Sequence, residues 1–232
     1  MVTLEELRLA AKQRADMENS EFVTDEEWNS YINHSIAELH DILIGAYNEE
    51  YVMESVIFTT SANQLDYDLP NGTNYSAAPK FYKLRGVDAA VGGDEWNTVK
   101  RFNFNRRNEN NAFSLNMAGL PYLEYRIVGS KIRFNRQPDP LTQIRLWYHP
   151  PATKLVADSD ELDPINGFDE YVVVDAAIKA KDKEESDTTV LQGQKLALKQ
   201  RLESMAQNRD ANEPESVTDV FAEDDWFLIS RG

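Results

Sequence analysis

Apolar residues recur at three- and four-residue spacing between Thr24 and Tyr47, and this is the strongest pattern in the chain. The stretch begins with Thr24 and Glu27, whose side chains can each accept a hydrogen bond from the other residue's backbone N–H. A helix is therefore predicted here, and only another helix or a sheet can cover its apolar stripe. The stripe comprises Trp28, Tyr31, Ile32, Ser35, Ile36, Leu39, Ile42, Leu43 and Ala46, with Glu38 and Asp41 expected on the other face.

Three further helices are predicted near the two ends of the chain. Thr3 and Glu6 form a second capping box, before a helix of about four turns that ends near Asn19. Asp163 and Pro164 resemble an N-cap followed by proline in the first helical turn. The last helix follows a tight turn at 183–187, so the final two helices form an antiparallel hairpin. Apolar faces are expected from Phe168, Tyr171, Val172, Ala176 and Ile178, and then from Val190, Leu191, Leu196, Leu198, Leu202 and Met205.

Between these helices the pattern changes to alternation and to β-branched and aromatic residues, which favour strands. The clearest case is residues 125–134, where Gly129 and Ser130 form a two-residue hairpin turn. That turn places Arg126 opposite Arg133. Residues 144–148 are predicted to be the third strand of this meander.

The order of the elements predicts an α+β fold. We expect a four-helix bundle layer with an antiparallel β domain inserted between helices 2 and 3, plus an extended C-terminal tail. The helical bundle domain would comprise residues 1–51 and 158–212, the inserted β domain 52–157, and the docking tail 213–232.

The chain has a formal net charge of −16, and the charge is unevenly distributed. Residues 52–149 carry 12 Lys and Arg and 9 Asp and Glu, whereas the rest of the chain carries 12 and 31. This balance argues against wrapping a DNA duplex, because phosphate binding depends on clustered Lys and Arg. Either the two regions face different neighbours, or the helices simply expose an acidic surface to solvent.

The composition also limits where and how the protein acts. There is no cysteine, so disulfides and thiolate chemistry are excluded. No apolar run reaches the ~18–20 residues of a membrane span, and the N-terminus lacks a signal-peptide pattern. We therefore expect synthesis in the cytoplasm and no membrane association.

No motif predicts an enzyme, a cofactor site or a metal site. The carboxylates of 158–163 have Leu162 and Asp163 where an EF-hand loop needs an oxygen ligand and a glycine. His34 and His40 are six residues apart on one helix and point to different sides. There is no P-loop, nucleophile elbow or dinucleotide fingerprint.

Three groups of residues are instead candidate sites for binding other molecules. Arg126 and Arg133 face each other, with Arg145 expected alongside, so they predict either an anionic neighbouring subunit or screening by solvent. Arg106 and Arg107 lie in a predicted long exposed loop, 103–121. The tail is too short to bury its own apolar residues, so these should pack on the chain's own core or in a partner's groove. They are Val217, Val220, Phe221, Trp226, Phe227, Leu228 and Ile229.

The chain resembles the head-to-tail adaptor (connector or neck) proteins of tailed bacteriophages at five short segments. These are Asp66-Tyr67-Asp68-Leu69-Pro70, Phe81-Tyr82-Lys83-Leu84-Arg85-Gly86-Val87-Asp88, Tyr171-Val172-Val173-Val174-Asp175-Ala176-Ala177-Ile178, Lys183-Glu184-Glu185-Ser186-Asp187 and Asn208-Arg209-Asp210. The resemblance implies helices with an inserted β domain and a non-enzymatic structural protein of the virion. It also implies a ring of twelve subunits beneath the portal protein, which holds the tail or the next neck protein.

Further implications concern the DNA channel and the tail. Double-stranded DNA would pass through the ring without specific binding, because acidic helices repel phosphate. The C-terminal tail would dock on the portal. Two other functions stay open from the sequence, namely a single-stranded nucleic-acid-binding module that uses the basic aromatic meander and a hydrolase without a recognisable motif.

Overall fold

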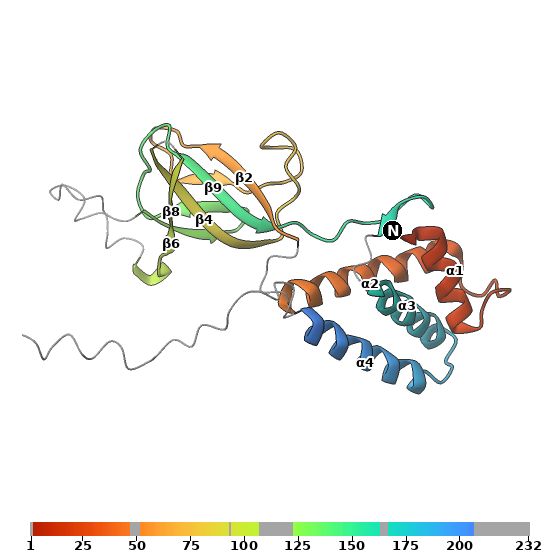
Figure 1. Cartoon of the computed structure of the whole chain (residues 1–232). Helices are drawn as coiled ribbons and strands as arrows, with labels where there is room; N and C mark the ends of the chain where they lie inside the picture. The colour runs from red at the N-terminus through yellow and green to blue at the C-terminus, as the bar shows by residue number, and fades with distance from the viewer. Residues whose placement is uncertain (1, 47–51, 93, 107–122, 163–166, 207–232) are drawn as a thin grey trace, which may run out of the picture.

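The computed structural model describes residues 2–46, 52–92, 94–106, 123–162 and 167–206 (Figure 1). These residues form a mixed α+β structure with two separate hydrophobic clusters. One cluster lies among the helices, and we call the helices together with β1 and β10 the helical unit. The other lies between two sheets formed by β2 to β9, which we call the β unit.

The helices begin at the predicted capping boxes. α1 (Leu4–Ala15) follows Thr3, whose backbone N–H donates to Glu6 over 2.9 Å while its hydroxyl accepts from the Glu6 N–H over 3.2 Å. α2 (Asp25–Ala46) begins with the same pair of bonds between Thr24 and Glu27, at 3.0 and 3.3 Å. α1 is shorter than predicted, because Asp16 adopts φ 58° and ends the helix there.

The second pair of helices forms around a short turn, as predicted. α3 (Asp169–Lys183) is followed by Glu185 in the left-handed region at φ 59°, and Asp187 then accepts from the Thr189 N–H at the start of α4 (Thr189–Ala206). α3 begins after Phe168, which makes no side-chain cap. The predicted cap, Asp163 with Pro164, lies outside the described residues.

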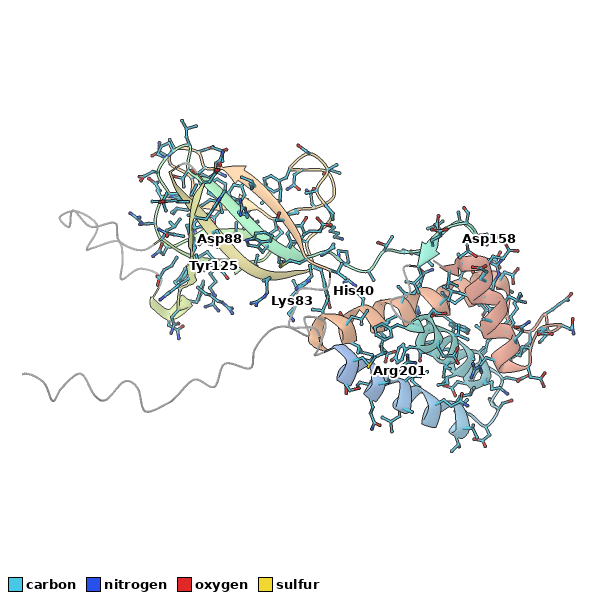
Figure 2. The ribbon with its side chains drawn as sticks, in the orientation of Figure 1. His40, Lys83, Asp88, Tyr125, Asp158 and Arg201 are labelled. Carbon is cyan, nitrogen blue, oxygen red and sulfur yellow. The ribbon has the colours of Figure 1, made fainter. Side chains whose placement is uncertain are left out.

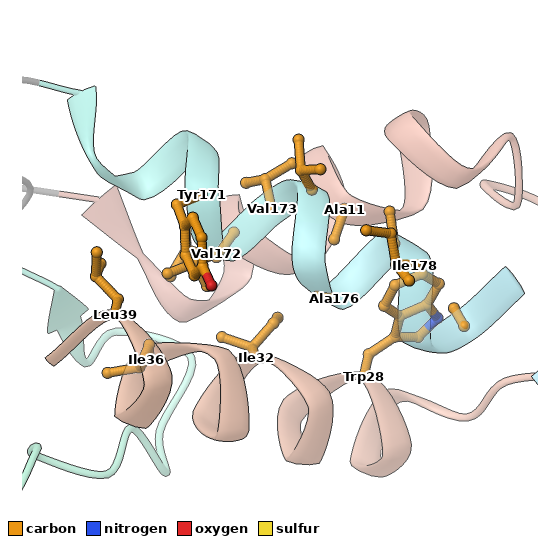
Figure 3. Packing of buried hydrophobic residues seen from close by; sticks show 14 of the residues in the cluster. Ala11, Trp28, Ile32, Ile36, Leu39, Tyr171, Val172, Val173, Ala176 and Ile178 are labelled. Atoms are coloured by element: carbon orange, nitrogen blue, oxygen red, sulfur yellow. The ribbon is translucent and has the colours of Figure 1, made fainter. Parts of the chain in front are cut away.

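α3 is the central helix of the helical unit and packs against α1, α2 and α4. A helix with neighbours on several sides has to be apolar around most of its circumference, which accounts for the unbroken buried run at 171–178. The predicted stripe of α2 faces it, with Ile36 near Tyr171 at one end and Trp28 near Ile178 at the other (Figure 3).

Two predictions about the helix faces are wrong. Glu38 does not lie away from the core, because it accepts from the Tyr171 hydroxyl over 2.7 Å and binds Lys195. In α4, Val190, Leu196 and Met205 are 72%, 58% and 49% exposed. α4 lies on the outside of the unit, so only Leu191, Leu198 and Leu202 reach the cluster; apolar spacing alone did not distinguish them.

The β unit consists of two four-stranded sheets around one hydrophobic cluster. The first sheet has the order β2-β9-β4-β5 and comprises Glu54–Thr59, Gln143–His149, Lys83–Gly92 and Glu95–Thr98. The second has the order β3-β8-β7-β6 and comprises Asp66–Asp68, Lys131–Phe134, Glu124–Val128 and Lys100–Arg101.

The hairpin at Gly129 has the predicted register, with Arg126 opposite Arg133 and Gly129 at φ 61°. The predicted meander is wrong, because β9 crosses to the other sheet and pairs with β2 and β4. The β unit is also not wholly antiparallel, since β6 pairs with β7 in parallel. Alternation identifies a strand, but it does not identify the strand's partner.

The chain returns to the helical unit through a short ladder between its beginning and the segment before α3. β1 (Val2–Thr3) pairs with β10 (Glu161–Leu162), and the Leu4 N–H donates to the Asp160 carbonyl over 2.9 Å. This contact places β10 beside the start of α1. The domain boundaries themselves stay a prediction.

Candidate interaction surfaces

The opposed arginines of the second sheet have partners within their own chain. The Arg133 Nε lies 3.2 Å from Asp66 on β3, and the Arg126 guanidinium donates to the Phe102 carbonyl over 3.3 Å. Arg126 also lies over the Phe104 ring, 5.4 Å from its centroid. Arg133 thus has an anionic partner and Arg126 has polar and aromatic partners within the chain. A role of these two residues in a subunit interface stays a prediction.

Arg145 does not lie alongside Arg126 and Arg133, because its strand belongs to the first sheet. It is stacked on aromatic rings instead, with its guanidinium carbon 3.9 Å from the Trp96 centroid and 5.4 Å from that of Trp147. This cluster could not be predicted from spacing along the chain, since it depends on the pairing of β9 with β4 and of β4 with β5.

Two predicted sites fall largely outside the described residues. Arg106 ends a short 3-10 helix, η1 (Phe104–Arg106), and Arg107 follows in the part that the structure does not describe. All seven apolar residues of the C-terminal tail also lie beyond the last described residue, Ala206.

A buried polar network, which was not predicted from the sequence, crosses the helical unit. Asp175 of α3 is 2% exposed and binds Lys179, with the Lys195 Nζ at 2.8 Å and the Ser35 hydroxyl at 2.6 Å. Lys195 also lies 2.9 Å from Glu38. Ser35 and Asp175 each interrupt an apolar helix face, and this interruption was the only sign of the network in the sequence. Their spacing along the chain does not show that the two side chains contact each other.

The network sets the charge state of Asp175. Burial raises the pKa of this carboxyl, but the hydrogen bonds from Lys179, Lys195 and Ser35 outweigh burial and lower the pKa below its usual value. Asp175 thus carries a negative charge at neutral pH and holds α4 to α3 through Lys195. The network connects α2, α3 and α4, and it fixes the positions of these helices relative to one another.

A groove of about 720 Å³ lies where the two units meet. One wall is the end of α2, with Leu39, His40 and Leu43, and the opposite wall includes Pro79 and Pro150. The His40 Nε2 lies 2.9 Å from the Pro150 carbonyl oxygen. Figure 2 places His40 and Lys83 at this junction. Its lining is mixed, because Glu54, Lys80 and Glu161 lie beside the apolar residues. Grooves between two structural units are common binding sites.

A second contact joins the units beside this groove. The Tyr82 hydroxyl donates to the Asp41 carboxylate over 2.8 Å, and this bond raises the pKa of the phenol by stabilising its protonated form. The rings of Tyr82 and His40 also lie 6.3 Å apart.

The candidate ligands for a metal ion make other contacts. Asp158 binds Arg8 over 3.0 Å, and Asp160 accepts from the backbone N–H groups of Val156 and Ala157. The His149 Nδ1 lies 2.9 Å from the Val52 carbonyl oxygen. In the described part of the chain, no group of three or more His, Asp or Glu could hold a metal ion. No helix in that part is both long enough and apolar enough to cross a membrane.

An exposed sheet face with tryptophan and arginine side chains has the composition of surfaces that bind other proteins. Comparison with known families gives the class directly. The model of the SU10 adaptor protein family matches residues 2–218, and the chain belongs to that family. It is accordingly a phage adaptor protein, a virion component that binds other virion components. Membership of an adaptor family points to a structural protein and away from an enzyme. No curated protein matches the chain.

Proposed function

We propose that the protein is a head-to-tail adaptor, which forms a ring under the portal, connects the capsid vertex to the tail and continues the DNA channel. The observation that carries this proposal is the family match, which covers both the helical unit and the β unit. A match confined to one unit would support only a shared module.

The charge distribution supports the channel part of the proposal. Outside residues 52–149 the chain has 31 Asp and Glu and 12 Lys and Arg. A channel wall formed by the helical unit would therefore repel the DNA phosphates and let the duplex slide. Specific DNA binding is not part of the proposed role.

The C-terminal tail is the proposed link to the portal. It combines Trp226, Phe227, Leu228 and Ile229 with Asp219, Glu223, Asp224 and Asp225, a composition suited to an apolar cleft with a basic rim. The family match ends at residue 218, so all of these residues lie beyond it. We propose that this last segment fits the particular portal of this virion.

The proposal is tested by mixing the purified chain with the portal protein of the same virion. Negative-stain imaging should show a ring of adaptor subunits on one face of the portal, and native mass spectrometry should give the stoichiometry, which the resemblance places at twelve. A chain that stays unbound and monomeric would contradict the proposed function.

A further inference from the structure

The outer face of the β2-β9-β4-β5 sheet carries an aromatic cluster around one arginine. Along β9, Ile144 and Leu146 point into the core and are fully buried, whereas Arg145 and Trp147 point outward and are partly exposed. Ile57 of β2 lies opposite Arg145 and is 47% exposed. We call the group Ile57, Trp96, Arg145 and Trp147 the tryptophan–arginine face.

Arg145 is held in place but is not neutralised. Its guanidinium stacks on Trp96 at 3.9 Å, while the Trp147 Nε1–H donates over 2.7 Å to Asp88, the residue opposite Arg145 in the β4 register. Within the described part of the chain, no hydrogen bond or ion pair involves the Arg145 guanidinium. A stacked, pre-oriented guanidinium with free N–H donors suits a carboxylate, which it can bind with two parallel hydrogen bonds.

A surface of complementary character lies in the loop between α1 and α2. This acidic loop, residues 16–24, contains Asp16, Glu18 and Glu21 and no Lys or Arg. Phe22 projects from it and is 53% exposed. The loop is fixed from behind by Lys183, which donates to the Phe22 carbonyl over 3.1 Å and lies 4.9 Å from the ring centroid.

The two surfaces belong to opposite ends of the molecule. The acidic loop lies at the end of the helical unit that is remote from the β unit (Figure 1). It cannot reach the tryptophan–arginine face of its own chain, so any pairing of the two surfaces joins separate copies.

We propose that the acidic loop of one copy docks on the tryptophan–arginine face of the next, with Phe22 against the exposed rings and Glu21 or Glu18 on the guanidinium of Arg145. Such a contact joins two different surfaces and is the kind that closes into a ring. Burial of an aromatic residue and an arginine at its centre is typical of interface hot spots. This inference rests on the proposed ring.

The same face is less suited to nucleic acid. Stacking rings and an arginine are used by single-strand binders, but those also need a positively charged groove that follows the backbone. Of the four residues of the tryptophan–arginine face, only Arg145 is a cation. One guanidinium can bind one carboxylate of a docked loop, but it does not form the positively charged groove that a nucleic-acid backbone needs.

A charge-reversal experiment tests the pairing. Arg145→Glu and Glu21→Arg should each weaken self-association by about tenfold or more, measured by analytical ultracentrifugation, because each variant sets like charges against each other. The double variant Arg145→Glu/Glu21→Arg should recover most of the lost affinity. Lys131→Glu, which makes the same charge change on the other sheet, should have no effect, and circular dichroism should show that every variant is folded.

Cysteine pairing supplies an independent measurement, because the chain has no cysteine of its own. A Phe22→Cys chain mixed with an Ile57→Cys chain should give a disulfide-linked dimer under mild oxidation, since the bond needs Cα atoms within about 7 Å. Val128→Cys, at a residue 40% exposed on the other sheet, is the matched control and should not be linked to Phe22→Cys.

The possible results separate this inference from the proposed function. If Arg145→Glu and Glu21→Arg assemble as well as the wild type does, the inferred interface is wrong. The proposed ring is not contradicted by that result. Loss of binding to a fluorescent single-stranded oligonucleotide in Arg145→Glu, with assembly unchanged, would show a nucleic-acid surface and also overturn it. A wild type that forms no ring, alone or with the portal, would contradict the proposed function itself.

Discussion

Single residues determine how the helical unit is anchored, and Trp28 is the largest of its fully buried side chains. Its ring lies edge-on to Tyr31 with the centroids 6.4 Å apart. Its indole N–H is buried without a hydrogen-bond partner among the described residues. Trp28 therefore contributes through packing, and its one polar atom reduces that contribution.

Truncating Trp28 should destabilise the whole helical unit. Trp28→Ala is expected to lower the free energy of unfolding by about 3–5 kcal/mol, through lost burial and the cavity left behind. Trp28→Phe keeps a ring and removes the unpaired N–H, so it should cost clearly less. Urea denaturation followed by circular dichroism measures both. An unchanged midpoint for Trp28→Ala would show that α2 is not anchored through this residue.

Residue patterns gave the helices and the hairpin correctly, because the information for those features is local. The capping boxes at Thr3 and Thr24 and the turn at Gly129 each lie within a few residues of the element they define. The carboxylate of Glu38 was misplaced because its partners, Tyr171 and Lys195, are more than a hundred residues away along the chain.

At the scale of helices and strands, the spacing of apolar residues does not show which elements contact each other. The stacking of Arg145 required β9 to leave the hairpin and pair with β2 and β4, which depends on tertiary packing. Likewise, the solvent-exposed side of α4 follows from its position outside α2 and α3 and not from its own sequence. Arg126, Arg133 and Arg145 were identified from the sequence as candidate interface residues. Their distribution over two different sheets was not predicted.

The network between α3 and α4 makes a testable contribution to stability. Asp175→Asn removes the carboxylate that binds Lys179 and Lys195, and breaking such a buried pair should cost about 3 kcal/mol at pH 7. The Lys199–Glu203 pair of α4 is half exposed, with a separation of 3.9 Å, so Lys199→Met should change stability by less than about 1 kcal/mol and is the control. Equal losses in the two variants would argue against a special role for Asp175.

The same network predicts a pH dependence with a definite sign. The folded-state pKa of Asp175 is below its unfolded value, so its contribution is fully present above about pH 4 and is lost as the pH falls through the folded pKa. Urea midpoints of the wild type and Asp175→Asn should therefore differ at pH 7 and converge in acid. A difference that stays constant down to pH 2.5 would contradict this assignment.

At the scale of the whole molecule, two units are joined by a small junction with a groove beside it. The described residues of α1 to α4 form a core of their own in the helical unit. We expect the tail to serve binding and not folding.

Deleting Glu213 to Gly232 tests that expectation. The circular dichroism spectrum and the melting temperature should be nearly unchanged, while attachment to the portal should be lost. Replacing only Trp226, Phe227, Leu228 and Ile229 by serine keeps the length and the charges and should give the same result. A large fall in melting temperature with attachment retained would place the tail in the core of the helical unit.

The central claim is that this phage adaptor works as a ring on the portal. The most direct measurement is electron microscopy of the full chain mixed with the portal of its own virion, at a concentration where the complex survives dilution onto the grid. We expect class averages in which a second ring of uniform subunits, with an open central channel, covers one end of the portal. Portal particles without added density, beside a chain that remains monomeric in native mass spectrometry, would contradict it.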